Sequence, residues 1–515
     1  MRLALVLWLI PTFALSQPAK PVLTIYLPHT VTRPGASGKP PLVRALLLAV
    51  SDWDGAAPSV RTLDPEATVS CHKQKSGPGR FVADFHYEAK QPKGPAIAGD
   101  VTVHLQINDA VVRGEFKGSF HQLAFHGRAG AGLAYLFDSG ASDRGFLLWM
   151  AHLRTTVRGV VLFANGADGE ARQRAMEGDL QSFAAANQLA IVSTAGLGGP
   201  SAAANGETIV NALRELGARS GHREIETVPL FMMGHSAGGG MAVDFNCRLP
   251  ERVAGYISSH GGGDAKMPQA ALANPGIFTA GEIDPKGRPL SIESEFCFLR
   301  MAGARVSLVV EEGEQHPMGE GSMAYFLFTF QRLIAQRLPP GATTLQPLDD
   351  ARAWVADNAT WKDGITAIMP AISDGVELRP RLASLSLTLK KNHVDFQPLP
   401  LSIRLSWLID KDVAYVYRGI ATYGNRLTLR RSRDHGPAYL AGEAVELECA
   451  DFGAGPWKYV GLYDGATLLG EVKPRNPRLK LGRQTPGAHA GVLVGETPTG
   501  EVRTSLPVLW SVWPE

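Results

Sequence analysis

The chain has 515 residues, 45% of them hydrophobic, and a formal net charge of +2. This length suggests three or four domains of about 150 residues each, and the hydrophobic content excludes a chain that is disordered throughout. Because the charges nearly balance and no basic stripe stands out, we expect no nucleic-acid partner. The 56 glycines and 35 prolines follow no triplet period, which excludes collagen-like structure and favours many short strands.

The N-terminus has the pattern of an export signal. Arg2 supplies a positive charge, Leu3–Leu15 forms an apolar run, and Ala14-Leu15-Ser16 offers the small residues of a cleavage site. We therefore predict a signal peptide at residues 1–16 and a secreted or periplasmic mature protein. A membrane anchor is the alternative, but the run contains Pro11 and is shorter than the roughly 20 residues of a spanning helix. We expect no membrane span after signal removal.

Residues 17–140 are predicted to form a β-rich N-terminal domain. Val101–Ile107 alternates apolar and polar residues, Asn108-Asp109 is a turn signal, and a second alternating run continues to Phe120. Alternation with a period of two means one buried face per strand, so these strands should form a meander that packs on another layer. Because the segment carries no recognisable chemistry, we expect a structural or docking role.

Residues 141–340 change to strands that alternate with helices. Six apolar runs are predicted as strands: Gly159–Phe163, Leu189–Ser193, Val228–Met233, Val253–Ile257, Gly276–Thr279 and Val306–Val310. Between them, apolar residues recur at helical spacing, as in Met176, Leu180 and Phe183. This pattern is typical of a mainly parallel sheet covered on both faces, so we predict the α/β fold class for this domain.

Two further regions follow. Pro339-Pro340-Gly341 ends the last helix of the α/β domain, and residues 341–435 are predicted to be a connector of mixed structure. Within the connector, residues 383–389 alternate like a strand and residues 410–420 indicate a short helix. Residues 436–515 carry turn signals at short intervals and predict a small β-sandwich.

One segment carries chemistry, and it directly follows the predicted strand 228–233. Gly234-His235-Ser236-Ala237-Gly238 has the pattern G-x-S-x-G. At a sharp strand-to-helix turn this pattern exposes the serine oxygen, and the glycines are needed where side chains would collide with the neighbouring strand and helix. A glycine-rich turn with an incidental serine is the alternative. The position between a buried strand and a helix favours Ser236 as a nucleophile.

A serine nucleophile needs a base within hydrogen-bonding reach and an acid that orients the base. After a G-x-S-x-G turn, the acid and then the base follow along the chain. Asp284 and His316 occur in this order, each just past a predicted strand, and the carboxyl ends of parallel strands meet at one edge of a sheet. Glu282 is an alternative acid, but we favour Asp284.

Further residues are candidates for the pocket and the oxyanion hole. His260 either lines the pocket or belongs to an ordinary loop, and His235 should shape the turn because adjacent side chains on a sharp turn diverge. The backbone N–H of Ala237 should be one oxyanion donor. The second should come from the loop that contains Asn165, a further pocket candidate, and there we favour Ala167. This chemistry needs no metal or organic cofactor, so none is predicted.

The four cysteines are Cys71, Cys247, Cys297 and Cys449. None forms a C-x-x-C pair, which argues against a zinc or thioredoxin-type site. Export allows a disulfide, and we prefer Cys247–Cys297 because both fall in the α/β domain. Buried thiols are the alternative.

The sequence resembles known families in two places. Residues 227–240 and 248–253 resemble the nucleophile strand and helix of the α/β-hydrolase superfamily, nearest to esterases of the polyhydroxybutyrate-depolymerase and dienelactone-hydrolase kind. This resemblance implies a triad of Ser236, Asp284 and His316. In the oxyanion loop many relatives carry His-Gly, whereas this chain has Asn165-Gly166. Residues 436–515 resemble a bacterial immunoglobulin-like module, which implies a spacer or surface-binding role.

We therefore expect an exported serine hydrolase that cleaves carboxylic esters through an acyl-enzyme intermediate. A peptidase or amidase with the same triad is one alternative. A surface-binding protein with a degenerate hydrolase core is the other. The partner is an ester substrate, and the β-rich flanks favour a polymeric or surface-bound one, although the sequence does not identify it.

Overall fold

The computed structural model describes residues 145–514 apart from short gaps and the longer segments 358–367 and 378–404, and before residue 145 it describes the strands alone. The predicted signal peptide and the strand predicted at residues 383–389 therefore lie outside the described residues. Within the part that is described, no helix combines the length and the apolar character needed to cross a membrane.

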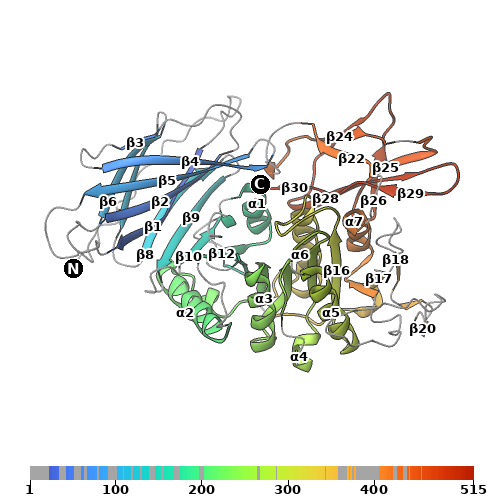
Figure 1. The fold of residues 1–515 in the computed structure, drawn as a ribbon, viewed down its shortest axis with the longest axis horizontal. Helices are drawn as coiled ribbons and strands as arrows, with labels where there is room; N and C mark the ends of the chain where they lie inside the picture. Colours follow the sequence, from blue (N-terminus) through green and yellow to red (C-terminus); the bar gives the residue numbers. More distant parts are fainter. Residues whose placement is uncertain are drawn as a thin grey trace.

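A nine-stranded sheet forms the centre of the molecule (Figure 1). Its strands, in spatial order, are β16 (Val306–Glu311), β15 (Gly276–Gly281), β14 (Val253–Ser259), β13 (Leu230–His235), β11 (Gly159–Ala164), β12 (Leu189–Ala195), β10 (Gly145–Met150), β9 (Gly130–Asp138) and β8 (Phe120–Gly127). Strands β11 to β16 run parallel to their neighbours among themselves, whereas β10 is antiparallel to both β12 and β9. All six predicted strands are present, and the α/β fold class predicted for the core is confirmed.

Helices cover both faces of the sheet, because alternate strand residues point to opposite sides. Leu147 and Trp149 of β10 pack in the same core as α1, α6 and α7, whereas Phe146 and Leu148 pack in the core of α2, α3 and α5. The helices are α1 (Gly178–Ala186), α2 (Ala202–Ser220), α3 (Ala237–Arg248), α4 (Gln269–Leu272), α5 (Arg288–Met301), α6 (Ser322–Arg337) and α7 (Lys411–Ala421). The short helix predicted at residues 410–420 is thereby confirmed as α7.

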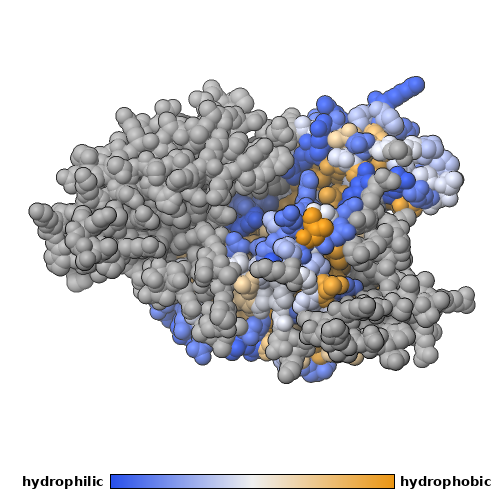
Figure 2. Space-filling model, in the orientation of Figure 1, coloured by the Kyte–Doolittle hydropathy of each residue, from blue (hydrophilic) through white to orange (hydrophobic). Residues whose placement is uncertain are grey.

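Helix α5 is absent from the sequence prediction, and its exposed apolar residues explain why. Leu290 and Met301 are more than half exposed, and Phe298 is exposed as well, so its apolar residues do not mark one buried face. Figure 2 shows hydrophobic patches on a visible described surface that is otherwise largely hydrophilic.

The strands before residue 145 form two further sheets and extend the central one. One of the two sheets contains β1 (Leu23–Arg33), β2 (Leu42–Ser51), β5 (Arg80–Lys90) and β4 (Ala67–Gly77). The other contains β3 (Val60–Thr62), β6 (Val101–Ile107) and β7 (Ala110–Phe116). The strand predicted at Val101–Ile107 is confirmed as β6. Because β10 pairs along its whole length with β9, the domain boundary predicted at residue 140 does not coincide with an edge of the central sheet.

The connector covers the edge of the sheet at β16. Strands β17 (Trp354–Asp357), β18 (Ile368–Pro370) and β21 (Leu405–Leu408) form a small sheet, and β19 (Ile372–Ser373) pairs with β20 (Val376–Glu377). The Leu308 N–H donates to Ser406 Oγ at 2.8 Å, and the Tyr417 hydroxyl donates to Leu308 O at 2.5 Å. These bonds satisfy backbone groups that an edge strand would otherwise expose.

The C-terminal region consists of two sheets that share a core. One contains β22 (Thr428–Arg431), β24 (Val445–Asp451) and β27 (Arg478–Leu481). The other contains β23 (Ala438–Tyr439), β30 (Val508–Val512), β28 (Gly487–Glu496), β25 (Tyr459–Asp464), β26 (Thr467–Glu471) and β29 (Val502–Thr504). Leu447 of the first sheet and Leu493 and Trp510 of the second are buried together. Because β22 precedes residue 436, the first sheet begins within the segment predicted to be the connector.

This region is continuous with the α/β core. Ala488, Leu509 and Trp513 are buried in the same cluster as α1 and α6, and the indole of Trp513 meets that of Trp149 edge-on with ring centroids 6.1 Å apart. The Ser511 hydroxyl lies within hydrogen-bonding distance of Asp179 O on α1, at 3.1 Å. The C-terminal sheets therefore form an outer layer over one face of the central sheet.

The described cysteines, Cys247, Cys297 and Cys449, form no disulfide bond with one another. The predicted Cys247–Cys297 bridge is wrong: both thiols are free, the Cys297 side chain packs from α5 into the apolar core, and Cys247 lies on α3. Cys297 and Cys449 are buried among apolar side chains, as the alternative expected.

Replacing Trp513 with alanine should lower the free energy of unfolding by about 3–5 kcal/mol, because it empties a buried position in the shared core. Urea unfolding followed by circular dichroism measures this loss. Leu468→Ala is the control: this side chain is 48% exposed on the same C-terminal region, and the change should stay within about 0.5 kcal/mol. Equal small losses for both variants would contradict a shared core.

Candidate active site

Ser236 lies at a strained turn between β13 and α3. Its φ is 56° and its ψ is −123°, and α3 begins at the next residue. A positive φ is uncommon for a residue other than glycine and costs free energy that the surrounding structure must supply. The turn lifts the serine hydroxyl away from the strand, as the G-x-S-x-G pattern predicts.

The two flanking glycines are required by close backbone packing. A Cβ at Gly234 would lie 1.9 Å from the carbonyl oxygen of Gly238, and a Cβ at Gly238 would lie 2.5 Å from the carbonyl oxygen of Ala164 at the end of β11. Both separations are far below van der Waals contact. The neighbouring helix and strand therefore exclude any side chain at these positions, which confirms the reason given for the glycines from the sequence.

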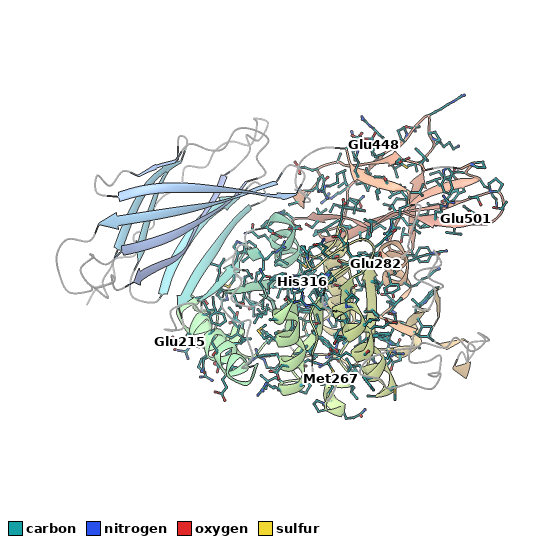
Figure 3. The ribbon with its side chains drawn as sticks, in the orientation of Figure 1. Glu215, Met267, Glu282, His316, Glu448 and Glu501 are labelled. Carbon is teal, nitrogen blue, oxygen red and sulfur yellow. The ribbon has the colours of Figure 1, made fainter. Side chains whose placement is uncertain are left out.

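The structure brings Ser236, His316 and Asp284 into one chain of hydrogen bonds. His316 Nε2 lies 2.8 Å from Ser236 Oγ, and His316 Nδ1 lies 2.7 Å from Asp284 Oδ2. The serine follows β13, the aspartate follows β15 and the histidine follows β16, so all three come from the carboxyl ends of parallel strands. His316 lies near the middle of the view in Figure 3.

The hydrogen-bonding capacities fix the proton on the His316 ring. An ionised carboxylate can only accept, so Nδ1 donates to Asp284 and Nε2 keeps the lone pair that faces the serine hydroxyl. Arg288 Nη1 lies 2.9 Å from His316 Nδ1 and 3.2 Å from Asp284 Oδ1. Because a guanidinium only donates, Arg288 can bond to the carboxylate but not to the protonated Nδ1.

Glu282, the alternative acid, has another role. Its side chain accepts from the Gly313 N–H at 3.0 Å, and its own N–H donates to Glu311 O at 2.9 Å. A Cβ at Gly281 would lie 1.9 Å from Gln315 O, so the loops after β15 and β16 are in close contact. Glu282 thus ties the two loops together, while Asp284 is the carboxylate bonded to His316.

His235 and His260 pack around the His316 ring. The His235 and His316 ring centroids are 5.1 Å apart, and those of His260 and His316 are 6.0 Å apart. Burial, followed by the nearby rings of His260 and His316, lowers the pKa of His235 to about 3. His235 therefore stays neutral in ordinary buffers, and the ring bonded to Ser236 is that of His316.

The residues predicted to form the oxyanion hole lie at the start of α3 and in the loop after β11. Ala237 is the first residue of α3, where helix N–H groups have no intrahelical acceptor. Ala167 lies outside the described residues. Gly166 was not singled out from the sequence, yet a Cβ at this glycine would lie 3.1 Å from Ser236 Cβ and 3.4 Å from Ser236 Oγ. Its N–H donates to Asn165 Oδ1 at 2.8 Å. A glycine three residues after the predicted strand 159–163, in the loop expected to supply the oxyanion donor, was the signal that could have identified it.

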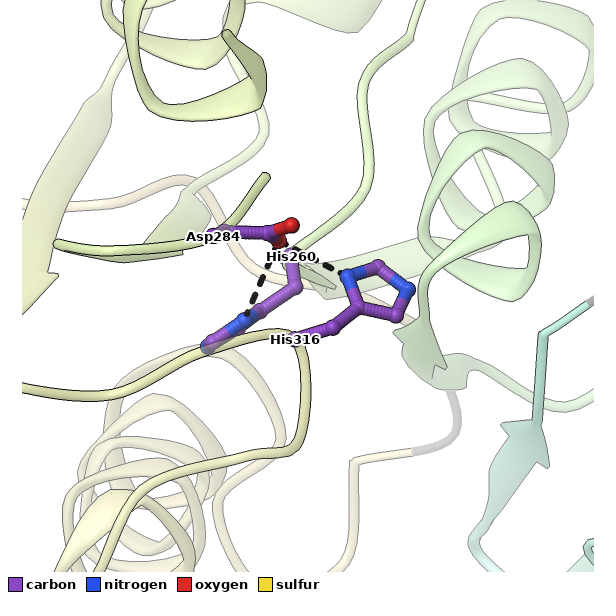
Figure 4. Close-up of side chains that lie close together, drawn as sticks. All are labelled: His260, Asp284 and His316. Carbon is purple, nitrogen blue, oxygen red and sulfur yellow. Dashed lines mark hydrogen bonds and ion pairs between the residues drawn. The ribbon is translucent and has the colours of Figure 1, made fainter. Parts of the chain in front are cut away.

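Three of these side chains also have the donor types of a metal site. Ligand atoms of His260, Asp284 and His316 lie within 4.8 Å of one another (Figure 4). A metal ion bound there would have to replace the hydrogen bond between Asp284 and His316, which the present geometry keeps. The arrangement is that of a base oriented by an acid, a chemistry that uses the side chains themselves.

No family model matches this chain, and no curated protein matches it. Solved structures match over part of it. Esterase PE8 is 18% identical with a TM-score of 0.28, covering 33% of this chain and 89% of that one. A phospholipase/carboxylesterase from Dyadobacter fermentans is 18% identical with a TM-score of 0.26, covering 34% and 90%. An esterase from Pyrobaculum calidifontis is 14% identical with a TM-score of 0.26, covering 38% and 77%. These partial likenesses do not assign an activity.

Replacing Gly166 with alanine should slow covalent labelling of Ser236 by a fluorophosphonate probe about 100-fold, because a methyl group would occupy the space from which a reacting centre approaches the hydroxyl. Labelling rates measured by gel fluorescence test this. Gly482→Ala is the control, because nothing lies within 4 Å of a Cβ there. Unchanged labelling of the Gly166 variant would show that the approach runs elsewhere.

Proposed function

We propose that this chain is a serine hydrolase with an α/β-hydrolase core that cleaves carboxylic esters. The observation that carries the proposal is the continuous chain of hydrogen bonds from Ser236 Oγ through His316 to Asp284. The strained turn at Ser236 and the chain order of serine, acid and base support it. The choice of an ester rests on the resemblance of residues 227–240 and 248–253 to esterases.

In the first half-reaction Ser236 Oγ attacks the ester carbonyl carbon. His316 Nε2 takes the hydroxyl proton and passes it to the leaving alcohol, while Asp284 keeps the ring oriented and stabilises its charged form. The N–H of Ala237 faces the negative charge that develops on the carbonyl oxygen. Removing one such donor costs about 3–4 kcal/mol of transition-state stabilisation, and the loop at Asn165 is the proposed source of the second.

In the second half-reaction water replaces the alcohol. His316 Nε2 removes a proton from the water, the resulting hydroxide attacks the acyl group on Ser236, and the proton returns to Oγ as the acid leaves. The buried Asp284 carboxylate serves both halves, because the histidine is transiently cationic in each. Protein side chains and backbone supply every group in this scheme.

The flanking regions and the leader complete the proposal. We propose that residues 1–16 direct export, that the C-terminal sheets are an immunoglobulin-like module, and that the substrate is polymeric or surface-bound. Two sheets of mostly antiparallel strands that share a core support the module. The substrate class rests on the β-rich regions that flank the core along the chain.

Ser236→Ala should lower hydrolysis of p-nitrophenyl acetate by at least about 1,000-fold, because the nucleophile is lost. Thr227→Ala is the control and should leave the rate unchanged, because the exposed Thr227 hydroxyl bonds within its own turn.

Short p-nitroanilide peptides assayed beside the esters decide between an esterase and a peptidase or amidase. An unmodified Ser236 after fluorophosphonate treatment of the wild-type protein would instead favour a degenerate core.

Expression of the full chain in a bacterial host should give a periplasmic or secreted product that begins at Gln17, because the leader has a charged start, an apolar run and small residues at its end. N-terminal sequencing of the product checks this. A cytoplasmic product that retains residues 1–16 would contradict export without affecting the proposed chemistry.

A further inference from the structure

His260 is buried beside the triad in an unusual backbone conformation. It follows β14, its exposed fraction is 1% and its φ is 51°. Its N–H donates to Thr279 O at 2.9 Å, and a Cβ at the next residue, Gly261, would lie 2.2 Å from Ser236 O. The loop is thus held between β15 and the serine turn. A strained residue of this kind in a site-lining loop points to a role in that site.

The His260 ring stands between two buried carboxylates. Nε2 lies 2.9 Å from Glu311 Oε2, and Nδ1 lies 3.8 Å from Asp284 Oδ2 (Figure 4). The side chains of Asp284 and Glu311 are 0% and 4% exposed. Asp284 Oδ2 is also the atom that accepts from His316 Nδ1. One carboxylate oxygen therefore faces two imidazole rings.

Glu311 determines which nitrogen of His260 carries a proton. Besides the ring, its carboxylate accepts from the Gly319 N–H at 2.6 Å and from the Ser322 hydroxyl at 2.6 Å. A carboxylate engaged as an acceptor requires His260 Nε2 to donate. In the neutral ring, Nδ1 then holds a lone pair towards Asp284, and this buried nitrogen has no hydrogen-bond partner in the described part of the chain.

We propose that His260 is a positioning residue for the proposed ester hydrolysis, which acts on His316 through their shared acceptor, Asp284 Oδ2. The neutral ring leaves Asp284 Oδ2 to His316. When His260 takes a second proton, its Nδ1–H competes for that oxygen and its positive charge opposes the charging of His316. The site is then active only when both rings are neutral before the reaction. This inference rests on the proposed function.

Three other charged or titratable groups lie around this ring. Arg288 remains cationic beside Asp284. Burial keeps the pKa of His235 at about 3, so this ring stays neutral. Glu295 on α5 faces the same loop through the Gly263 N–H. The proposal assigns the acid side of the activity profile to His260 and His316.

The test is the pH dependence of kcat/KM for p-nitrophenyl acetate. In a plot of log kcat/KM against pH, the acid limb of the wild type should approach a slope of about 2, because two coupled protons must leave. His260→Gln should reduce this slope to about 1, and any loss of activity in this variant should appear in kcat rather than in KM. His260→Asn is a second variant, since asparagine tolerates a positive φ.

His222→Gln is the matched control. His222 is also buried and also pairs with a glutamate, at 2.9 Å, but it lies at the other end of β13. The His222→Gln variant should therefore keep the slope of about 2.

Histidine Cε1–Hε1 NMR titration of the wild-type protein provides a readout that needs no activity. The His316 signal should shift in two steps, and in one step after His260→Gln or His260→Asn. A single His316 step in the wild type, or an acid-limb slope of about 1 that the variants do not change, would overturn the proposal. If the chain hydrolyses no ester, the proposed function fails while this titration still decides the coupling of the two rings.

Discussion

Close backbone packing at the end of β13 is the constraint on which the site depends. There is no room for a Cβ at Gly234 or Gly238, and Ser236 is held at a positive φ with its N–H donating to Ser259 O at 2.7 Å. The helix α3 can start only if β11, β14 and the serine turn meet at these separations. The position of the hydroxyl on the partly buried Ser236 is therefore a consequence of how three strands and one helix pack, and it is fixed before any substrate arrives.

Buried carboxylates organise the loops that complete the site. Asp284 orients His316, and Glu311 holds both the His316 loop, through the Gly319 N–H, and the ring of His260. Such groups are stable in a low-dielectric interior only when donors surround them. The loops after β14, β15 and β16 thus share one network, in which a change at one ring alters the acceptor available to another.

The outer layers have a structural role that their separate sequence patterns conceal. The connector satisfies backbone groups of β16, and the C-terminal sheets bury Trp513 in the core of α1 and α6. Burial of this kind extends the core of the α/β domain into the two outer layers. The part of the site formed by the ends of β15 and β16 is supported by segments that follow it by about a hundred residues or more along the chain.

The sequence by itself determined the α/β core, six of its strands and the order of Ser236, Asp284 and His316, because each depends on local apolar pattern or on a motif tied to a strand end. It left Glu282 and Asp284 as alternative acids, preferred a Cys247–Cys297 bridge that does not form, and missed α5 and Gly166. Only the tertiary structure decided these points. Which carboxylate reaches His316, which thiol is packed under a helix and which glycine faces the serine depend on distances between residues far apart along the chain. The pairing of His260 with Glu311 was also decided by the tertiary structure, since no local sequence pattern encodes a contact between two strand ends.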